Sequence, residues 1–192
     1  MAPEDGPRTR WAVARVLFGH RSTHVILVSL VPLLAVRATG DRVVLGDLWA
    51  VAAVAALWPA MEWGMHVAMH APPLAIGTWS IDPEVCRAHR RHHEHPGVVD
   101  DLLLPPLILA ALAVLAWVAL PWLFGRGPGW SAAVAFHIGG LLNGWVHLLT
   151  HTSVRPRTRY YAWIRKTHTL HHCKDHRRWF SFTGPWLDGW RR

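Results

Sequence analysis

The chain has 192 residues, of which 52% are hydrophobic and 13 are tryptophan. This length favours one domain, and long apolar runs without a polar face disfavour a soluble helical bundle. The net charge of +8 comes mainly from basic residues beside the apolar runs. It favours contact with anionic lipid headgroups and requires no nucleic-acid partner.

Four apolar runs have the length and composition of membrane helices. They cover roughly residues 23–39, 48–70, 102–124 and 130–150. Residues 1–20 precede them as an N-terminal tail, and its first ten residues are too polar for a cleavable signal peptide. Residues 71–101 are inserted between the second and third runs, and residues 151–192 follow the fourth. We therefore expect one all-α membrane domain over residues 1–192, a four-helix bundle with a helical cap.

The positions of arginine and lysine predict the topology. Seventeen of the 20 lie before the first run, in the 71–101 insertion or after residue 151. The other three, Arg37, Arg42 and Arg126, lie in the two opposite loops. Cytoplasmic segments carry the excess of positive charge, so both termini, the insertion and the cap should be cytoplasmic.

Ten of the 15 histidines form two copies of one pattern, HxxxH followed by HxxHH. They are His66, His70, His89, His92 and His93 in the first copy, and His147, His151, His168, His171 and His172 in the second. Because helix positions i, i+3 and i+4 share a face, each cluster is expected to direct its imidazoles to one point. Ten imidazoles exceed the needs of one ion, so the pattern predicts two metal ions in the cytoplasmic cap.

The ligand type favours iron. A structural zinc site usually includes cysteine, but the chain has no CxxC pair, and Cys86 and Cys173 are expected to be reduced thiols outside the site. Paired histidine sites suit redox-active iron with open positions for oxygen, although zinc can replace iron during purification. The absence of HExxH disfavours a zinc hydrolase. A membrane metal transporter or sensor is the alternative class, but transporter ligands usually lie at the bilayer midplane.

Other polar residues are expected to support the ligands. Glu62 and Asn143 each lie four positions before an HxxxH motif and inside an apolar run, where an ionisable residue is usually functional. Further residues expected to orient ring N–H groups or handle protons are Asp100, Asp101, Asp175, His95 and His176. His20 and His24 are expected at the surface, and His137 in an inter-helix hydrogen bond.

These motifs resemble the fatty acid hydroxylase/sterol desaturase superfamily of integral-membrane di-metal oxygenases, over roughly residues 58–190. EWGMHVAMH resembles its Glu-aromatic-x-x-His segment, and HRRHHEHPGVVDDLLLPP its HxxHH, acidic stretch and double proline. The spacing from HLLTH to HTLHH and the tail WFSFTGPWLDGW, with Asp188, resemble the fatty acid 2-hydroxylase branch. The first HxxxH and the HHE of the second cluster instead resemble the sterol branch, so the substrate stays open.

The resemblance implies a reaction in which two iron ions use O₂ to hydroxylate a C–H bond of a lipid, or to desaturate it. A fatty acyl or sphingolipid chain entering from the bilayer is favoured, and a sterol or carotenoid is the alternative. The chain has no flavin, nicotinamide or haem-domain motif, so a separate electron donor of the ferredoxin or cytochrome type is implied. The basic residues between 155 and 178 are a candidate docking surface for it.

Overall fold

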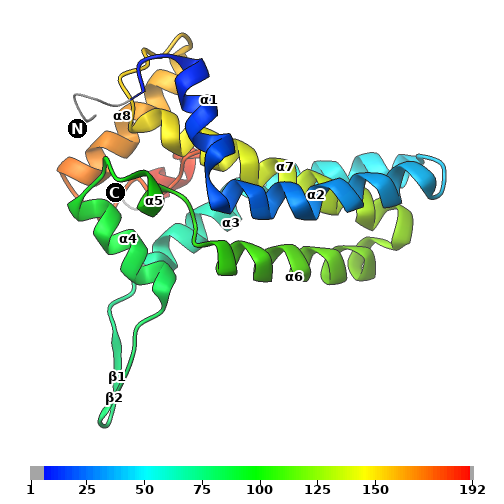
Figure 1. The fold of residues 1–192 in the computed structure, drawn as a ribbon, viewed down its shortest axis with the longest axis horizontal. Coiled ribbons are helices and arrows are strands. Elements are labelled where there is room, and N and C mark those ends of the chain that lie inside the picture. Colours follow the sequence, from blue (N-terminus) through cyan, green and yellow to red (C-terminus); the bar gives the residue numbers. More distant parts are fainter. Residues whose placement is uncertain (1–6, 191–192) are drawn as a thin grey trace.

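Four long helices run side by side as one elongated bundle in the computed structural model, which describes residues 7–190 (Figure 1). They are α2 (Arg21–Thr39), α3 (Leu45–Met69), α6 (Pro106–Phe124) and α7 (Arg126–Thr150). Each lies within a segment that is long and apolar enough to cross a membrane, which confirms the four predicted spans. Large apolar side chains such as Leu107 and Trp122 are about four-fifths exposed (80% and 81%) and are suited to contact lipid.

The helix α7 lies at the centre of the bundle and contacts α2, α3 and α6. A glycine permits its close approach to α3, because a Cβ atom added at Gly139 would lie 2.6 Å from the indole ring of Trp58. His137 of α7 hydrogen-bonds Ser29 of α2 through Nε2 at 2.9 Å, which confirms the predicted inter-helix bond. The same Ser29 hydroxyl accepts a hydrogen bond from Trp117 of α6, so three spans share one polar contact.

A buried ion pair fixes the end of the bundle that is remote from the histidines. Arg37, at the end of α2, donates to Asp47 in the first turn of α3 at 2.9 Å. Ser131 of α7 donates to the same carboxylate at 2.6 Å, and the backbone N–H of Val44 donates at 2.8 Å. Three helices are therefore joined through one side chain, Asp47.

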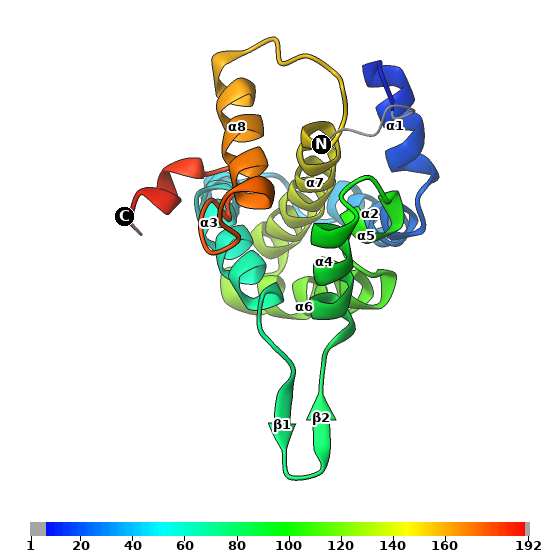
Figure 2. The same ribbon diagram turned by 90° about the vertical axis from the view of Figure 1, so that its left-hand side faces the viewer.

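Short helices cover the other end of the bundle, where both described ends of the chain also lie (Figures 1 and 2). These are α1 (Arg10–Gly19), α4 (Glu84–Glu94), α5 (Val99–Leu102), α8 (Arg159–Cys173) and the 3₁₀ helix η1 (Pro185–Trp190). The predicted tail is thus partly helical: Thr9 caps α1, and Val13 and Leu17, one turn apart, pack with Leu148 of α7 in a buried cluster. Residues 1–6 of that tail lie outside the described part of the chain.

The described chain is mostly helical, as expected, and one short element of it is not a helix. Residues 71–83 form a β-hairpin, with β1 (Leu74–Ile76) pairing antiparallel with β2 (Trp79–Ile81). Gly77 makes the tight turn with a φ of 60°, which glycine adopts without strain. The segment alternates apolar and small residues with period two, as a strand does, and prolines bracket it.

Candidate metal centre

The ten predicted histidines gather at the capped end of the bundle in two groups of five. The first group is His66, His70, His89, His93 and His171, and the second is His92, His147, His151, His168 and His172. Each residue offers one ring nitrogen, and within a group these nitrogens all lie within 4.8 Å of one another. The structure therefore brings together every predicted ligand and divides them between two positions.

The two sequence copies exchange one ligand, which corrects the expectation that each cluster serves one point. In HRRHH, His89 and His93 join the first group, whereas His92 joins the second. In HTLHH the outer residues stay in the second group and the middle one, His171, crosses to the first. Successive residues of a helix point about 100° apart, so neighbouring histidines such as His92 and His93 face different positions.

Within the first group the Nε2 atoms face one another at short distances. His89 Nε2 lies 2.9 Å from that of His70 and 3.1 Å from that of His93. His171 Nε2 lies 3.1 Å from that of His93 and 3.2 Å from that of His70. In the second group the corresponding pairs are His151–His168 at 2.7 Å and His92–His172 at 3.1 Å.

Backbone carbonyls orient two of the rings. His66 Nδ1 hydrogen-bonds the carbonyl oxygen of Phe180, and His171 Nδ1 that of Arg178 at 2.6 Å. A carbonyl oxygen only accepts, so Nδ1 carries the proton in both rings, and Nε2 of the neutral ring presents a lone pair. Lone pairs converging at these distances repel one another unless a cation lies between them. The donor set thus fits a metal ion, with the second nitrogen held as metal-ligating histidines usually hold it.

Burial keeps the ligands in the form that binds metal. Desolvation, helped by neighbouring rings, lowers the pKa of His70 and of His171 to about 4. The pKa values of His151 and His168 are lowered well below the usual range for the same reasons. These rings are neutral at pH 7, as metal binding requires. The buried Nε2 atom of His147 has no hydrogen-bond partner among the described residues, as expected of a ligand atom.

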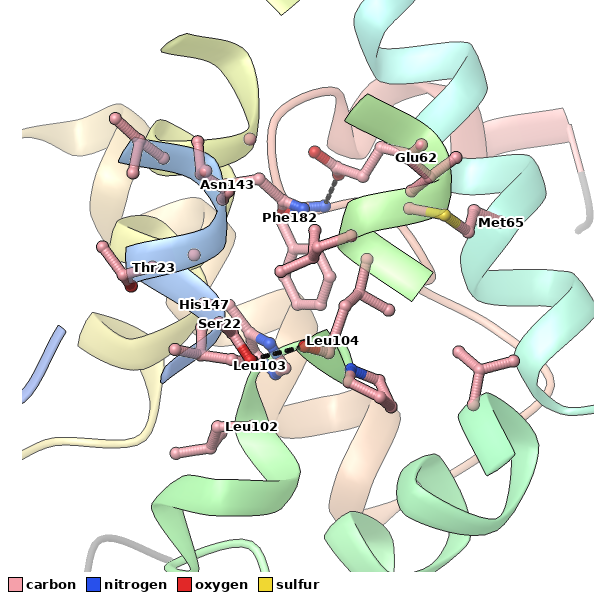
Figure 3. Close-up of a pocket in the computed structure, with 18 of the residues that line it drawn as sticks. Ser22, Thr23, Glu62, Met65, Leu102, Leu103, Leu104, Asn143, His147 and Phe182 are labelled. Atoms are coloured by element: carbon pink, nitrogen blue, oxygen red, sulfur yellow. Dashed lines mark hydrogen bonds between the residues drawn. The ribbon is translucent and has the colours of Figure 1, made fainter. Parts of the chain in front are cut away.

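Glu62 supports the centre through the C-terminal segment. Its carboxylate accepts hydrogen bonds from the backbone N–H groups of Phe182 and Thr183 and from the hydroxyls of Ser181 and Thr183. The Glu62–Phe182 bond is visible in Figure 3. The segment it holds supplies the Phe180 carbonyl to His66, so Glu62 acts on the ligand through the backbone and does not contact the ring nitrogens.

Phe182 and Asp188 complete this arrangement. The Phe182 ring packs between the two groups, with its centroid 5.1 Å from that of His66 and 4.4 Å from that of His147. The Asp188 carboxylate accepts from the backbone N–H of Phe180 at 3.0 Å and from the indole of Trp63 at 3.1 Å. Asp188 therefore fixes the same segment that Glu62 holds.

The other predicted supporting carboxylates do not hydrogen-bond the ligand rings. Asp101 pairs with Arg91 at 2.8 Å, and Asp100 with His20 at 3.1 Å. Asp175 pairs with Arg178 at 3.3 Å, although its charge also acts to raise the pKa of His171.

The remaining predicted residues divide between the site and the surface. The ring of His176 lies 4.6 Å from that of His93, beside the first group, whereas His95 is exposed and belongs to neither group. His24 hydrogen-bonds the Phe18 carbonyl and is also outside both groups. Cys173 is exposed and free.

A narrow cavity of about 150 Å³ runs from the histidines into the bundle between α2, α3, α6 and α7. His66, His89 and His147 line its end at the metal centre, and His137 and Trp58 lie further along α7 and α3. Most of the remaining wall is apolar, as the leucine, methionine and phenylalanine side chains of Figure 3 show. Asn143 also lines the cavity, and its buried Oδ1 has no partner among the described residues.

Sequence reasoning missed the two backbone carbonyls and the packing role of Phe180 and Phe182. A carbonyl has no residue-type signal, so no motif could reveal it. The tail resemblance identified the segment but not its contacts.

A bundle of helices apolar enough to cross a membrane, capped by two five-histidine groups that could each hold a metal ion, defines the class of the molecule. The chain matches the family model described as "Fatty acid hydroxylase" over residues 51–191, most of its length and all ten clustered histidines. It belongs to the fatty acid hydroxylase family. No curated protein and no solved structure matches the chain.

Proposed function

We propose that the protein is a membrane di-iron oxygenase that hydroxylates a C–H bond of a lipid, with a fatty acyl or sphingolipid chain as the favoured substrate. The observation that carries the proposal is the cavity, because an apolar passage between membrane helices ends at His66, His89 and His147. An acyl chain is apolar and already lies in the bilayer. A cavity of about 150 Å³ has room for a short segment of such a chain beside the histidines, while the rest of the chain stays in the lipid.

The reaction would insert one atom of O₂ into a C–H bond and release the other as water, using two electrons and two protons. Iron held by the two histidine groups supplies the oxygen chemistry when bound. The protein's own residues keep the imidazoles neutral, orient the His66 and His171 rings and exclude water with Phe180 and Phe182. The electrons come from a separate donor, for which we propose a ferredoxin or cytochrome.

Basic residues near α8 are the proposed surface for that donor. Arg155, Arg157, Lys166 and Lys174 are exposed on this side of the metal centre, and an acidic partner would be steered towards them. We place this surface, both termini and the metal centre on the cytoplasmic side, because the excess of arginine and lysine lies there. A metal transporter is a weaker proposal, since the histidine groups lie at the ends of the spans and not near their middle.

Lipid analysis of expressing cells tests the proposal. Cells that make the wild-type protein should contain a lipid heavier by one oxygen atom, which is absent with His93→Ala because that change removes a ring of the first group. The class of the new lipid separates an acyl or sphingolipid substrate from a sterol or carotenoid. A lipid that instead lacks two hydrogen atoms would mean desaturation. No lipid change in cells where the protein is folded and metal-loaded would contradict the proposal.

A further inference from the structure

The β-hairpin presents a fully apolar face that nothing in the described chain covers. Its register pairs Leu74 with Ile81 and Ile76 with Trp79, and residues two apart in a strand share a face. These four side chains therefore lie together, and their exposed fractions range from 52% for Ile81 to 78% for Trp79. The small residues at positions 75 and 80 form the other face. A compact, exposed patch of large apolar side chains commonly marks a binding surface.

The hairpin lies where a lipid surface would be. It leaves the capped end of the bundle and runs across the direction of the spans, as both views show (Figures 1 and 2). Seen along the spans, it reaches past α6 and beyond the cross-section of the bundle (Figure 2). If the four helices cross a bilayer, the hairpin extends along its surface and lies over the lipid beside α6. The first turn of α6 also exposes an apolar side chain, Leu107, which is 80% exposed.

An ion pair and a hydrogen bond join the base of the hairpin to the helix α4. Arg90 binds the carboxylate of Asp82, the residue after β2, with its Nη2 atom 2.5 Å from Oδ2. Arg87 donates to the backbone carbonyl of the same residue. The hairpin is thus anchored to the helix that carries His89 and His93.

We propose that the apolar face of this hairpin binds the interfacial layer of the bilayer and anchors the metal-binding cap on the membrane surface. Tryptophan is enriched at that depth, and a structure with one apolar and one small or polar face lies in the interface plane. Strands of three residues offer few backbone groups for pairing with a second copy, which favours lipid as the occupant. The proposal does not depend on the catalytic activity.

Nitroxide labelling at the turn provides the test. Thr78→Cys would be labelled in a Cys173→Ser background, because Cys173 is the exposed free cysteine and Cys86 is buried. The protein would be placed in nanodiscs of phosphatidylcholine and phosphatidylglycerol. Relaxation of the label by oxygen, which concentrates in lipid, would be compared with relaxation by a water-soluble nickel chelate. Ser153→Cys, exposed in the loop before α8, is the matched control in water.

We expect the label at residue 78 to be relaxed more by oxygen and less by nickel than the label at residue 153. Adding Ile76→Ser and Trp79→Ser should move residue 78 into water, so that both labels respond alike. Equal nickel accessibility at the two positions without these changes would overturn the proposal. So would an unchanged depth after the apolar face is removed. Spin–spin broadening at residue 78 that disappears on dilution with unlabelled protein would also overturn it, since the face would then bind a second copy.

Discussion

The exchange of His92 and His171 between the two sequence copies determines how the metal sites depend on single residues. His171 lies in the second HxxHH motif, but its Nε2 atom is 3.2 Å from that of His70. Each metal position therefore draws ligands from both copies. Residues far apart in the sequence, such as His66 and His171, therefore belong to the same group, and replacing either one should affect the same metal ion.

Paired substitutions test this exchange. His171→Ala should lower the metal content by about one equivalent. Adding His66→Ala should lower the metal content little further, because the effects of substitutions within one site are not additive. Combining His171→Ala with His147→Ala should remove both ions. Elemental analysis of each purified variant gives the answer. Complete metal loss in the first pair and half loss in the second would show that each copy binds its own ion.

Glu62→Gln tests whether Glu62 positions the His66 ring through the backbone of the C-terminal segment. The substitution keeps the size of the side chain but removes the charge that accepts four hydrogen bonds from residues 181–183. Loss of a residue that orients a metal ligand typically costs about 10–100-fold in metal affinity or activity, and we expect a change in that range. Chelator competition measures the affinity, with Glu62→Ala as the more severe variant. If both variants bind metal with wild-type affinity, Glu62 serves only in helix packing.

At the scale of elements, local sequence patterns predict the spans and the ligands but not how the ligands are divided or oriented. The four spans and the ten ligands could be predicted because apolar length and i, i+4 spacing are local signals. Helix rotation separates neighbouring histidines within each HxxHH motif, but which group each one joins depends on how α4 and α8 are placed relative to one another. The carbonyl partners depend on the path of residues 178–182. The hairpin was not predicted because each strand has only three residues, so the alternation of apolar and small residues is too short to distinguish a strand from a loop. Such features arise from tertiary packing.

The ion pair between Arg37 and Asp47 gives a prediction about the elements α2, α3 and α7. Removing one partner of a buried pair leaves an uncompensated charge and typically costs about 3–5 kcal/mol. Asp47→Ala should therefore lower the thermal unfolding temperature in detergent. The double variant Arg37→Met/Asp47→Leu removes both charges and should recover most of the loss. Unfolding of Asp47→Ala at the wild-type temperature would show that the pair does not stabilise the bundle.

At the scale of the whole molecule, both described chain ends lie at the capped end of the bundle (Figure 1). The two histidine groups lie there too, and most arginine and lysine residues belong to the segments that form this end. The positive-inside rule then predicts that this end is cytoplasmic. Reporter fusions after residues 98 and 190 should report the cytoplasm, and fusions after residues 42 and 127 the opposite side. An outside report at residue 98 together with an inside report at residue 190 would be incompatible with one shared site.

The metal content of the intact protein tests the central claim most directly. Two groups of five histidines, with their ring nitrogens within 4.8 Å in each group, predict about two transition-metal ions per chain. Elemental analysis after detergent purification and anaerobic iron loading should find both, and zinc counts as occupancy because it competes with iron for imidazole. One equivalent or fewer in folded, fully loaded protein would contradict the account.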